Sequence, residues 1–390
     1  MIRLKMKPAD CMLLPAIALT FLSCNANREE GQESFCLEAS GRQLSFALDS
    51  RTKNETQALF LHTDEEGREY VTFQNMGRNE ILFYDVRTQA LAFKIAPPVE
   101  GRNGVGIMDG YYIKNMDSIF LTVAGRNELV LIDREAVVKD VFPCYETGDG
   151  TALERTASLS FLSHPLVAVG DMLFLLPECN RFSEKNPVCA AVSLSDRSVR
   201  AFPAFPYPSF PGQDNRMKKA SAENYVSRCF DGKRFAYSFY YDEDIRVAPL
   251  NHESVTKIKA KSRYISRVEI PDDYGDATLE DLCTMPRYGN MLYDPYREVY
   301  YRIAYPRTTL DEEVRPLDIM RYGGKNFSLI ILDREFNVAG ETLFPDYTYN
   351  STIMFVREDG LYISESHSYN PAFSDDVLSF RCFELKKNKH

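Results

Sequence analysis

The sequence predicts an all-β fold, a six-bladed β-propeller, from three observations. A unit made of a turn, a short apolar strand and a second turn occurs three times, at 77–85 (GRNEILFYD), 125–135 (GRNELVLIDRE) and 324–335 (GKNFSLIILDRE). Apolar and polar residues alternate from residue 42 onward, the period of a β-strand. Tyr and Phe, with 23 and 25 copies, replace Trp, which is absent, and aromatic residues favour strands. A unit repeated at such spacing indicates a radial or stacked β array rather than one sandwich.

The predicted strands form meanders of four, separated by turns rich in Gly, Asn and Asp. The first three blades are expected at 57–62, 70–74, 80–85 and 89–95; at 107–114, 118–124, 128–133 and 136–142; and at 160–164, 171–177, 188–194 and 198–205. The next two are expected at 224–230, 234–241, 245–250 and 254–260, and at 290–293, 299–305, 327–333 and 338–344. A proline-rich connection at 206–212 and a short acidic helix at 272–284 flank the fourth blade.

The last blade has strands at 351–357, 361–367 and 377–385 and lacks a fourth. The stretch 42–48 resembles the outer strand at 89–95 and is expected to supply the missing fourth strand of the last blade. Strands from both ends of the chain would then close the ring and remove its open edges. Five or seven blades are the alternatives, because the third blade is weakly marked.

Residues 1–23 are predicted to be a lipoprotein signal peptide. A positive start with Arg3, Lys5 and Lys7 precedes an apolar run of about a dozen residues, which is the length of a signal-peptide core and too short to span a bilayer. The residues at 21–24 (FLSC) resemble the lipobox of bacterial lipoproteins, although Phe stands where Leu is usual. The alternative is an ordinary cleaved signal.

In this interpretation Cys24 carries the lipid and is the first residue of the mature chain. The polar, acidic stretch that follows is expected to act as a flexible tether over 24–40, and the propeller domain to occupy 41–387. The net charge of −10 opposes nucleic acid and anionic membrane surfaces as partners. The lipid is therefore the predicted link to the membrane.

The nine cysteines do not form a disulfide framework or a Cys-x-x-Cys metal site. Most are expected to be buried small apolar residues. Cys179 and Cys189 flank a loop between two predicted strands and are the one pair that could form a disulfide.

The stretch from 289 to 303 (GNMLYDPYREVYYRI), with the lipobox and the irregular six-fold repeat, resembles a domain-of-unknown-function family of propeller lipoproteins from gut Gram-negative bacteria. More distantly, the chain is similar to six-bladed propellers of the TolB or NHL type. From the lipidated N-terminus we expect an outer-membrane lipoprotein that faces the periplasm or the cell surface. The resemblance itself implies only the fold and lipidation. It implies no catalytic residues.

The long insertions at 178–187, 307–326 and 368–376 all fall between second and third strands, so they are expected to crowd one face. The resemblance places a propeller's ligand site on that face. Turns of the repeated unit add Arg78, Arg126 and Lys325 there, which would suit an anionic or sugar-like ligand. The alternative is that these are solubilising turn residues.

The stretch around Tyr293, Asp294 and Arg302 is a further candidate for ligand contact. The alternative is an ion pair with aromatic packing that locks the fifth blade.

Motifs of enzymes are mostly missing from the sequence. It contains no Gly-x-Ser-x-Gly, His-Glu-x-x-His or phosphate-binding glycine loop, and its five His have no ligand spacing, so no metal or cofactor is predicted. The turn at 242–244 (DED) could bind calcium but is typical of a solvated turn. Glycosidase chemistry needs only carboxylates, and Asp109, Asp231 and Asp294 lie near inner strands.

We therefore expect a lipid-anchored propeller of the cell envelope that binds a ligand or protein without catalysis. The first alternative is a propeller enzyme, a hydrolase or lyase, that acts on glycans through carboxylates. A structural subunit of an envelope complex is the second.

Overall fold

The computed structural model describes residues 35–56, 58–75, 77–150, 153, 162–177, 187, 189–202, 226–268 and 278–388. The chain divides into two compact units, Met1–Gln32 and Glu33–His390. The first unit contains the predicted signal peptide and Cys24 and lies outside the described residues. The described residues of the second unit are all-β apart from short helices.

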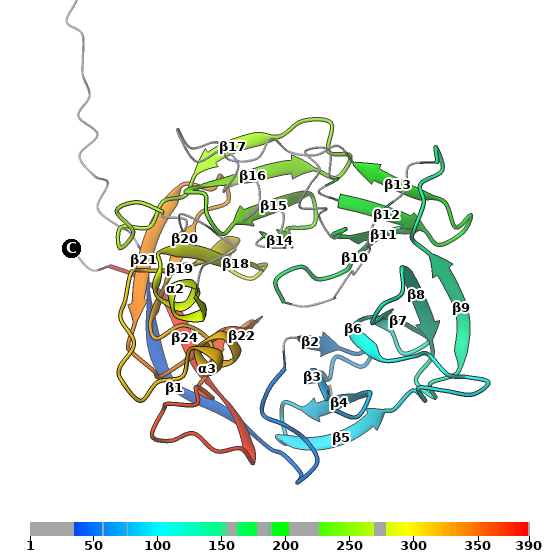
Figure 1. The fold of residues 1–390 in the computed structure, drawn as a ribbon, viewed down its shortest axis with the longest axis horizontal. Helices are drawn as coiled ribbons and strands as arrows, with labels where there is room; N and C mark the ends of the chain where they lie inside the picture. Colours follow the sequence, from blue (N-terminus) through cyan, green and yellow to red (C-terminus); the bar gives the residue numbers. More distant parts are fainter. Residues whose placement is uncertain are drawn as a thin grey trace, which may run out of the picture. The chain divides into compact units, whose positions relative to one another are not determined.

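Four sheets of this unit have four antiparallel strands in sequence order, as the meanders predict (Figure 1). The first sheet holds β2 (Leu59–Thr63), β3 (Glu69–Asn75), β4 (Glu80–Asp85) and β5 (Ala90–Ile95), and the second β6 (Met108–Asn115), β7 (Ser118–Val123), β8 (Glu128–Ile132) and β9 (Val138–Pro143). The third holds β10 (Val167–Val169), β11 (Met172–Leu175), β12 (Cys189–Ser193) and β13 (Val199–Phe202), and the fourth β14 (Val226–Phe230), β15 (Arg234–Phe239), β16 (Asp244–Pro249) and β17 (Thr256–Lys259).

A fifth sheet has eight strands in the order β18-β19-β20-β21-β1-β24-β23-β22. These strands are β18 (Arg287–Asp294), β19 (Val299–Tyr305), β20 (Phe327–Leu332), β21 (Val338–Phe344), β22 (Asn350–Arg357), β23 (Gly360–Ser364), β24 (Val377–Lys387) and β1 (Phe35–Ala47). One parallel residue pair, Phe35 with Gly340, joins its two halves.

The N-terminal strand lies beside the last strand of the chain, as expected. β1 pairs antiparallel with β24, from Phe35 opposite Lys387 to Ala47 opposite Val377. This pairing makes β1 start at Phe35, six residues before the predicted start of the domain at 41. The predicted tether is therefore too long at its C-terminal end.

Apolar side chains fill the spaces between neighbouring sheets. Six clusters join the first sheet to the second, the second to the third, the third to the fourth, the fourth to β18–β21, that half to β22–β24, and the last half back to the first sheet. The sheets thus follow one another around a common centre in a propeller-like arrangement (Figure 1).

Because the strands are antiparallel, turns alternate between the two ends of each sheet. We call the end with turns between second and third strands the loop face, and the opposite end the hairpin face. The insertions at 307–326 and 368–376 lie on the loop face, as predicted, and Tyr369 of one donates to Asp318 of the other (3.1 Å). Most of the insertion at 178–187 lies outside the described residues.

The structure corrects the prediction for the first strand of the third sheet. That strand is β10, Val167–Val169, rather than 160–164. Residues 162–164 form a turn instead, where the carbonyl of Ser163 accepts a hydrogen bond from the backbone N–H of Arg228 in β14 (2.8 Å). The sequence prediction therefore placed this strand too early in the chain.

Two short helices lie in the described part of the chain. α2 (Leu279–Thr284) is the end of the predicted acidic helix, and Thr278 caps it by accepting from the backbone of Asp281. α3 (Pro316–Tyr322) was not predicted. Its local signals are proline at its first turn, Asp318 in the first turn, Arg321 in the last turn and Gly323 after it, at φ 95°.

Candidate functional site

The three basic residues predicted for the loop face do not gather into one site. Arg78 is exposed in the β3–β4 turn. Arg126, in the β7–β8 turn, pairs with Glu128 (2.9 Å). Lys325 is only 12% exposed and pairs with Asp311 (3.3 Å). Lys325 therefore stabilises its own loop, and a role of these residues in binding stays a prediction.

Asp294 lies at the end of β18 on the hairpin face and is fully buried. Its carboxylate accepts from the backbone N–H of Tyr296 (3.0 Å) and pairs with Arg297 (2.8 Å), not with Arg302. The ring of Tyr293 lies 4.9 Å from that of Tyr300. Asp294 closes a turn and offers no surface to a ligand, which is the alternative that the sequence left open.

Arg302, in β19, is also fully buried, with its guanidinium 3.7 Å from the ring centre of Tyr288. It donates five hydrogen bonds that tie β19 to the fourth sheet. The acceptors are Ser238 Oγ (2.9 Å) and the carbonyl oxygens of Phe239 (3.3 Å), Asp242 (2.6 Å), Glu243 (2.8 Å) and Ala260 (2.9 Å). Arg302 is thus a structural cation rather than a ligand contact.

Of the predicted disulfide, only one partner can be placed. Cys189 is buried, and its sulfur lies 3.3 Å from Nη1 of Arg228. Cys179 and the lipidation site Cys24 lie outside the described residues, so both predictions stay open.

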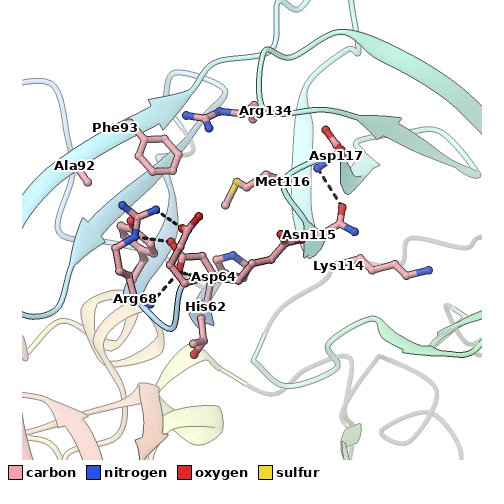
Figure 2. A pocket seen from close by; sticks show the side chains of 14 residues that line it. His62, Asp64, Arg68, Ala92, Phe93, Lys114, Asn115, Met116, Asp117 and Arg134 are labelled. Carbon is pink, nitrogen blue, oxygen red and sulfur yellow. Dashed lines mark hydrogen bonds and ion pairs between the residues drawn. The ribbon is translucent and has the colours of Figure 1, made fainter.

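A cavity of about 810 Å³ lies between the first and second sheets on the hairpin face, opposite to the face that the sequence indicates (Figure 2). We call it the groove. Its lining comes from four strands, β2, β3, β5 and β6, and from three turns, β2–β3, β6–β7 and β8–β9.

Aromatic side chains form the first-sheet side of the groove. Phe93 stacks on Phe83 with ring centres 4.4 Å apart and meets Tyr70 edge-on at 5.8 Å. His62 lies edge-on to Phe83 (6.3 Å). Burial lowers the pKa of His62 below its ordinary 6.5, so its imidazole is neutral at pH 7. Among the described residues, neither of its ring nitrogens has a hydrogen-bond partner.

Acidic residues of the β2–β3 turn line one side of the groove. Glu65 and Glu66 are exposed, whereas Asp64 accepts from the backbone N–H and Nε of Arg68 (2.8 and 2.7 Å). Burial would raise the pKa of Asp64, but the hydrogen bonds from Arg68 outweigh it and hold the pKa below its usual value. Asp64 is thus a fixed, ionised acceptor.

The second sheet supplies the opposite side, with Met116 at its centre. Arg134 reaches from the β8–β9 turn over the ring of Phe93, with its guanidinium carbon 5.6 Å from the ring centre. Figure 2 shows Phe93, Met116 and Arg134 directed toward the same space. The groove therefore combines a few apolar side chains with a mainly polar lining that carries charges of both signs.

Sequence reasoning missed this site, because its residues come from separate turns that only the packing of two sheets brings together. Arg134 does belong to the repeated unit at 125–135, but nothing local distinguishes it from other turn residues. In the described part of the chain, no group of three or more His, Cys, Asp or Glu is placed to hold a metal ion. No helix among those residues is long and apolar enough to cross a membrane.

Comparison with known proteins identifies the family. Residues 34–343 match the family DUF4221, described as a domain of unknown function. A crystal structure of a DUF4221 member from Bacteroides vulgatus is 25% identical, with a TM-score of 0.77 over 92% of this chain and 100% of that one. A protein from Bacteroides fragilis, provisionally named as an exported protein, is 8% identical, with a TM-score of 0.52 over 91% of this chain and 96% of that one. No curated protein matches the chain. The chain therefore belongs to the DUF4221 family, and it shares the propeller-like fold of these structures.

Proposed function

We propose that this protein is a lipid-anchored, six-bladed propeller of the cell envelope that binds a small ligand in the groove without transforming it. Six blades result when the eight-stranded sheet counts as two blades, since the single pair of Phe35 with Gly340 joins its halves. The signal-like N-terminus and the lipobox at Cys24 support an outer-membrane anchor facing the periplasm or the cell surface.

The groove carries the binding proposal. Its volume of about 810 Å³ lies in the usual range of ligand pockets, roughly 300–1,000 Å³. Such pockets combine an apolar lining with a few convergent polar groups. In the groove the apolar part is small, with Phe93 and Met116, and charged side chains such as Arg134, Glu65 and Glu66 make up much of the lining.

The protonation states of Asp64 and His62 argue against a general acid in the groove. General acid catalysis needs a group that carries a proton near neutral pH. Asp64 is held ionised by Arg68, and His62 is held neutral by burial. Both serve better as fixed hydrogen-bonding groups than as proton donors.

A library experiment tests this proposal. The full-length protein is screened against glycans and short peptides, with binding read by thermal shift and products read by mass spectrometry. Ala92, exposed at the groove, is replaced by Trp to fill it, and Thr256→Trp on the outer strand of the fourth sheet is the control. Binding that Ala92→Trp abolishes and Thr256→Trp preserves supports the proposal. Binding insensitive to Ala92→Trp, or turnover of a bound glycan, contradicts it.

One carboxyl group, that of Asp109, supports the enzyme alternative. Burial raises the pKa of Asp109, in the inner strand β6, as a general acid requires. Asp231 behaves differently: burial would raise its pKa, but hydrogen bonds, the strongest from Tyr300, lower it. If glycan products form and Asp109→Asn abolishes them while binding persists, the enzyme interpretation replaces the non-catalytic one.

A further inference from the structure

Arg134 is a cation in the groove with little to neutralise it. Its side chain is 55% exposed, and its ion pair among the described residues is a 3.5 Å contact with Glu135 of the same turn. Glu135 is itself 66% exposed, so the contact is weak. The guanidinium therefore keeps free donors while it lies over Phe93.

The next interface between sheets contains a comparable arginine that has a carboxylate partner. Arg197, in the β12–β13 turn, lies over Phe142 of β9 (5.8 Å), as Arg134 lies over Phe93 of β5. Unlike Arg134, it donates to both carboxylate oxygens of Asp140, each at 2.8 Å. Both hydrogen bonds come from one nitrogen, Nη2, so the contact is a charge-assisted pair in which Asp140 supplies Arg197 with a carboxylate.

The strand register shows why the two arginines differ. Phe83 and Leu131 hold the same place in the repeated unit, three residues after its Glu. Phe83 pairs with Phe93, and Leu131 pairs with Asp140. An aromatic ring thus stands in the first sheet where the second sheet has the carboxylate, so the chain itself does not supply an acid to Arg134 at this position.

The opposite side of the groove limits what can bind there. Glu65 and Glu66 are exposed carboxylates, and Glu66 pairs with Arg68 (2.5 Å). Both can accept from hydroxyl or ammonium donors, and Glu65 repels a ligand of high negative charge. The neutral imidazole of His62 adds one donor and one acceptor. A ligand that carries one carboxylate and neighbouring hydroxyl or ammonium donors would therefore suit both sides of the groove.

We propose that the groove binds a small carboxylate-bearing molecule, such as an acidic sugar or a peptide C-terminus, whose carboxylate takes on Arg134 the place that Asp140 takes on Arg197. This inference rests on the proposed function and specifies its ligand. The ligand's hydroxyl or ammonium groups face Glu65 and Glu66.

Matched pairs of probes test it by calorimetry on the full-length protein. Galacturonate is compared with galactose, and alanyl-alanine with its amide, so each pair differs in the carboxylate. We expect at least one acid to bind about 10-fold or more tightly than its neutral partner, and Arg134→Gln to abolish that difference. The pair that shows the preference identifies the acidic sugar or the peptide terminus.

Two further variants separate recognition from folding. Arg197→Gln removes an exposed ion pair outside the groove, so it should leave the preference for the acid unchanged. Phe93→Asp supplies Arg134 with an internal carboxylate and should weaken acid binding, whereas Phe93→Asn should do so less. Equal binding of acid and neutral partner, no acid binding, or a preference that survives Arg134→Gln overturns the inference. Neutral ligands that Ala92→Trp displaces would still support the proposed function.

Discussion

Replacing Arg302 with Met should destabilise the protein strongly, because it removes a buried cation whose acceptors remain. The stem stays, so packing against Tyr288 is largely kept. The carbonyls of Phe239 and Glu243 retain backbone donors (3.3 and 3.1 Å), so the loss falls on those of Asp242 and Ala260. Each buried acceptor left without a donor costs about 1–3 kcal/mol, which gives a loss of roughly 2–6 kcal/mol.

Urea unfolding followed by far-UV circular dichroism measures this change in the free energy of unfolding. The control is Arg334→Met, which breaks the surface pair with Glu298 (62% and 55% exposed) and should cost less than about 1 kcal/mol. Arg302→Lys should recover little, since one ammonium cannot reach the spread of acceptors. Equal midpoints for Arg302→Met and Arg334→Met would refute the assignment of Arg302 as the cation that joins these sheets.

Three further predictions concern the anchor, the acid stability and the seam between β1 and β21. Cys24→Ser should move the protein from the membrane to the soluble fraction and prevent fatty-acid labelling; a labelled variant would contradict lipidation. His367 is fully buried, and burial lowers its pKa to about 4, so the unfolded chain takes up the proton first. The free energy of unfolding should therefore fall by up to about 3 kcal/mol between pH 6.5 and pH 4. The urea midpoint of His367→Gln should fall less over this range. Equal falls for the variant and the wild type would contradict the role of His367. In Gly340→Ala the new Cβ would lie 1.9 Å from the carbonyl oxygen of Phe35, so amide exchange should rise at 35–39 and stay unchanged in β3; an unaltered rate would disprove the contact.

Much of the fold could be predicted because residue types at the turns determine the local backbone conformation. Asn79, in the first copy of the repeated unit, has φ 55°. Its side chain accepts from the backbone N–H of Met108 (2.6 Å) and donates to the carbonyl of Pro97 (2.9 Å). A residue type that tolerates left-handed backbone and satisfies nearby backbone groups marks its position in any sequence. The pairing of β1 with β24 followed from counting strands.

The site could not be predicted in the same way. Asp294 and Arg302 looked like site residues because charged and aromatic residues cluster around them, yet both are fully buried. Their acceptors and donors come from turns and neighbouring strands, which a single strand pattern does not reveal. The groove depends on how Phe93 and Arg134, which lie on different sheets, meet across an interface. Sequence periodicity predicts the strands but not the distance between these two side chains.

The pairing of β1 with β24 has a consequence for how the protein matures. Arg42 and Glu384, 342 positions apart, form an ion pair across this seam (2.7 Å). Bringing such distant segments together costs about 5 kcal/mol of chain entropy, which many ladder contacts must offset at once. The ring therefore cannot close until β24 is available, although β1 is the first strand of the fold. Until then, β1 keeps an unpaired edge with which another chain can pair.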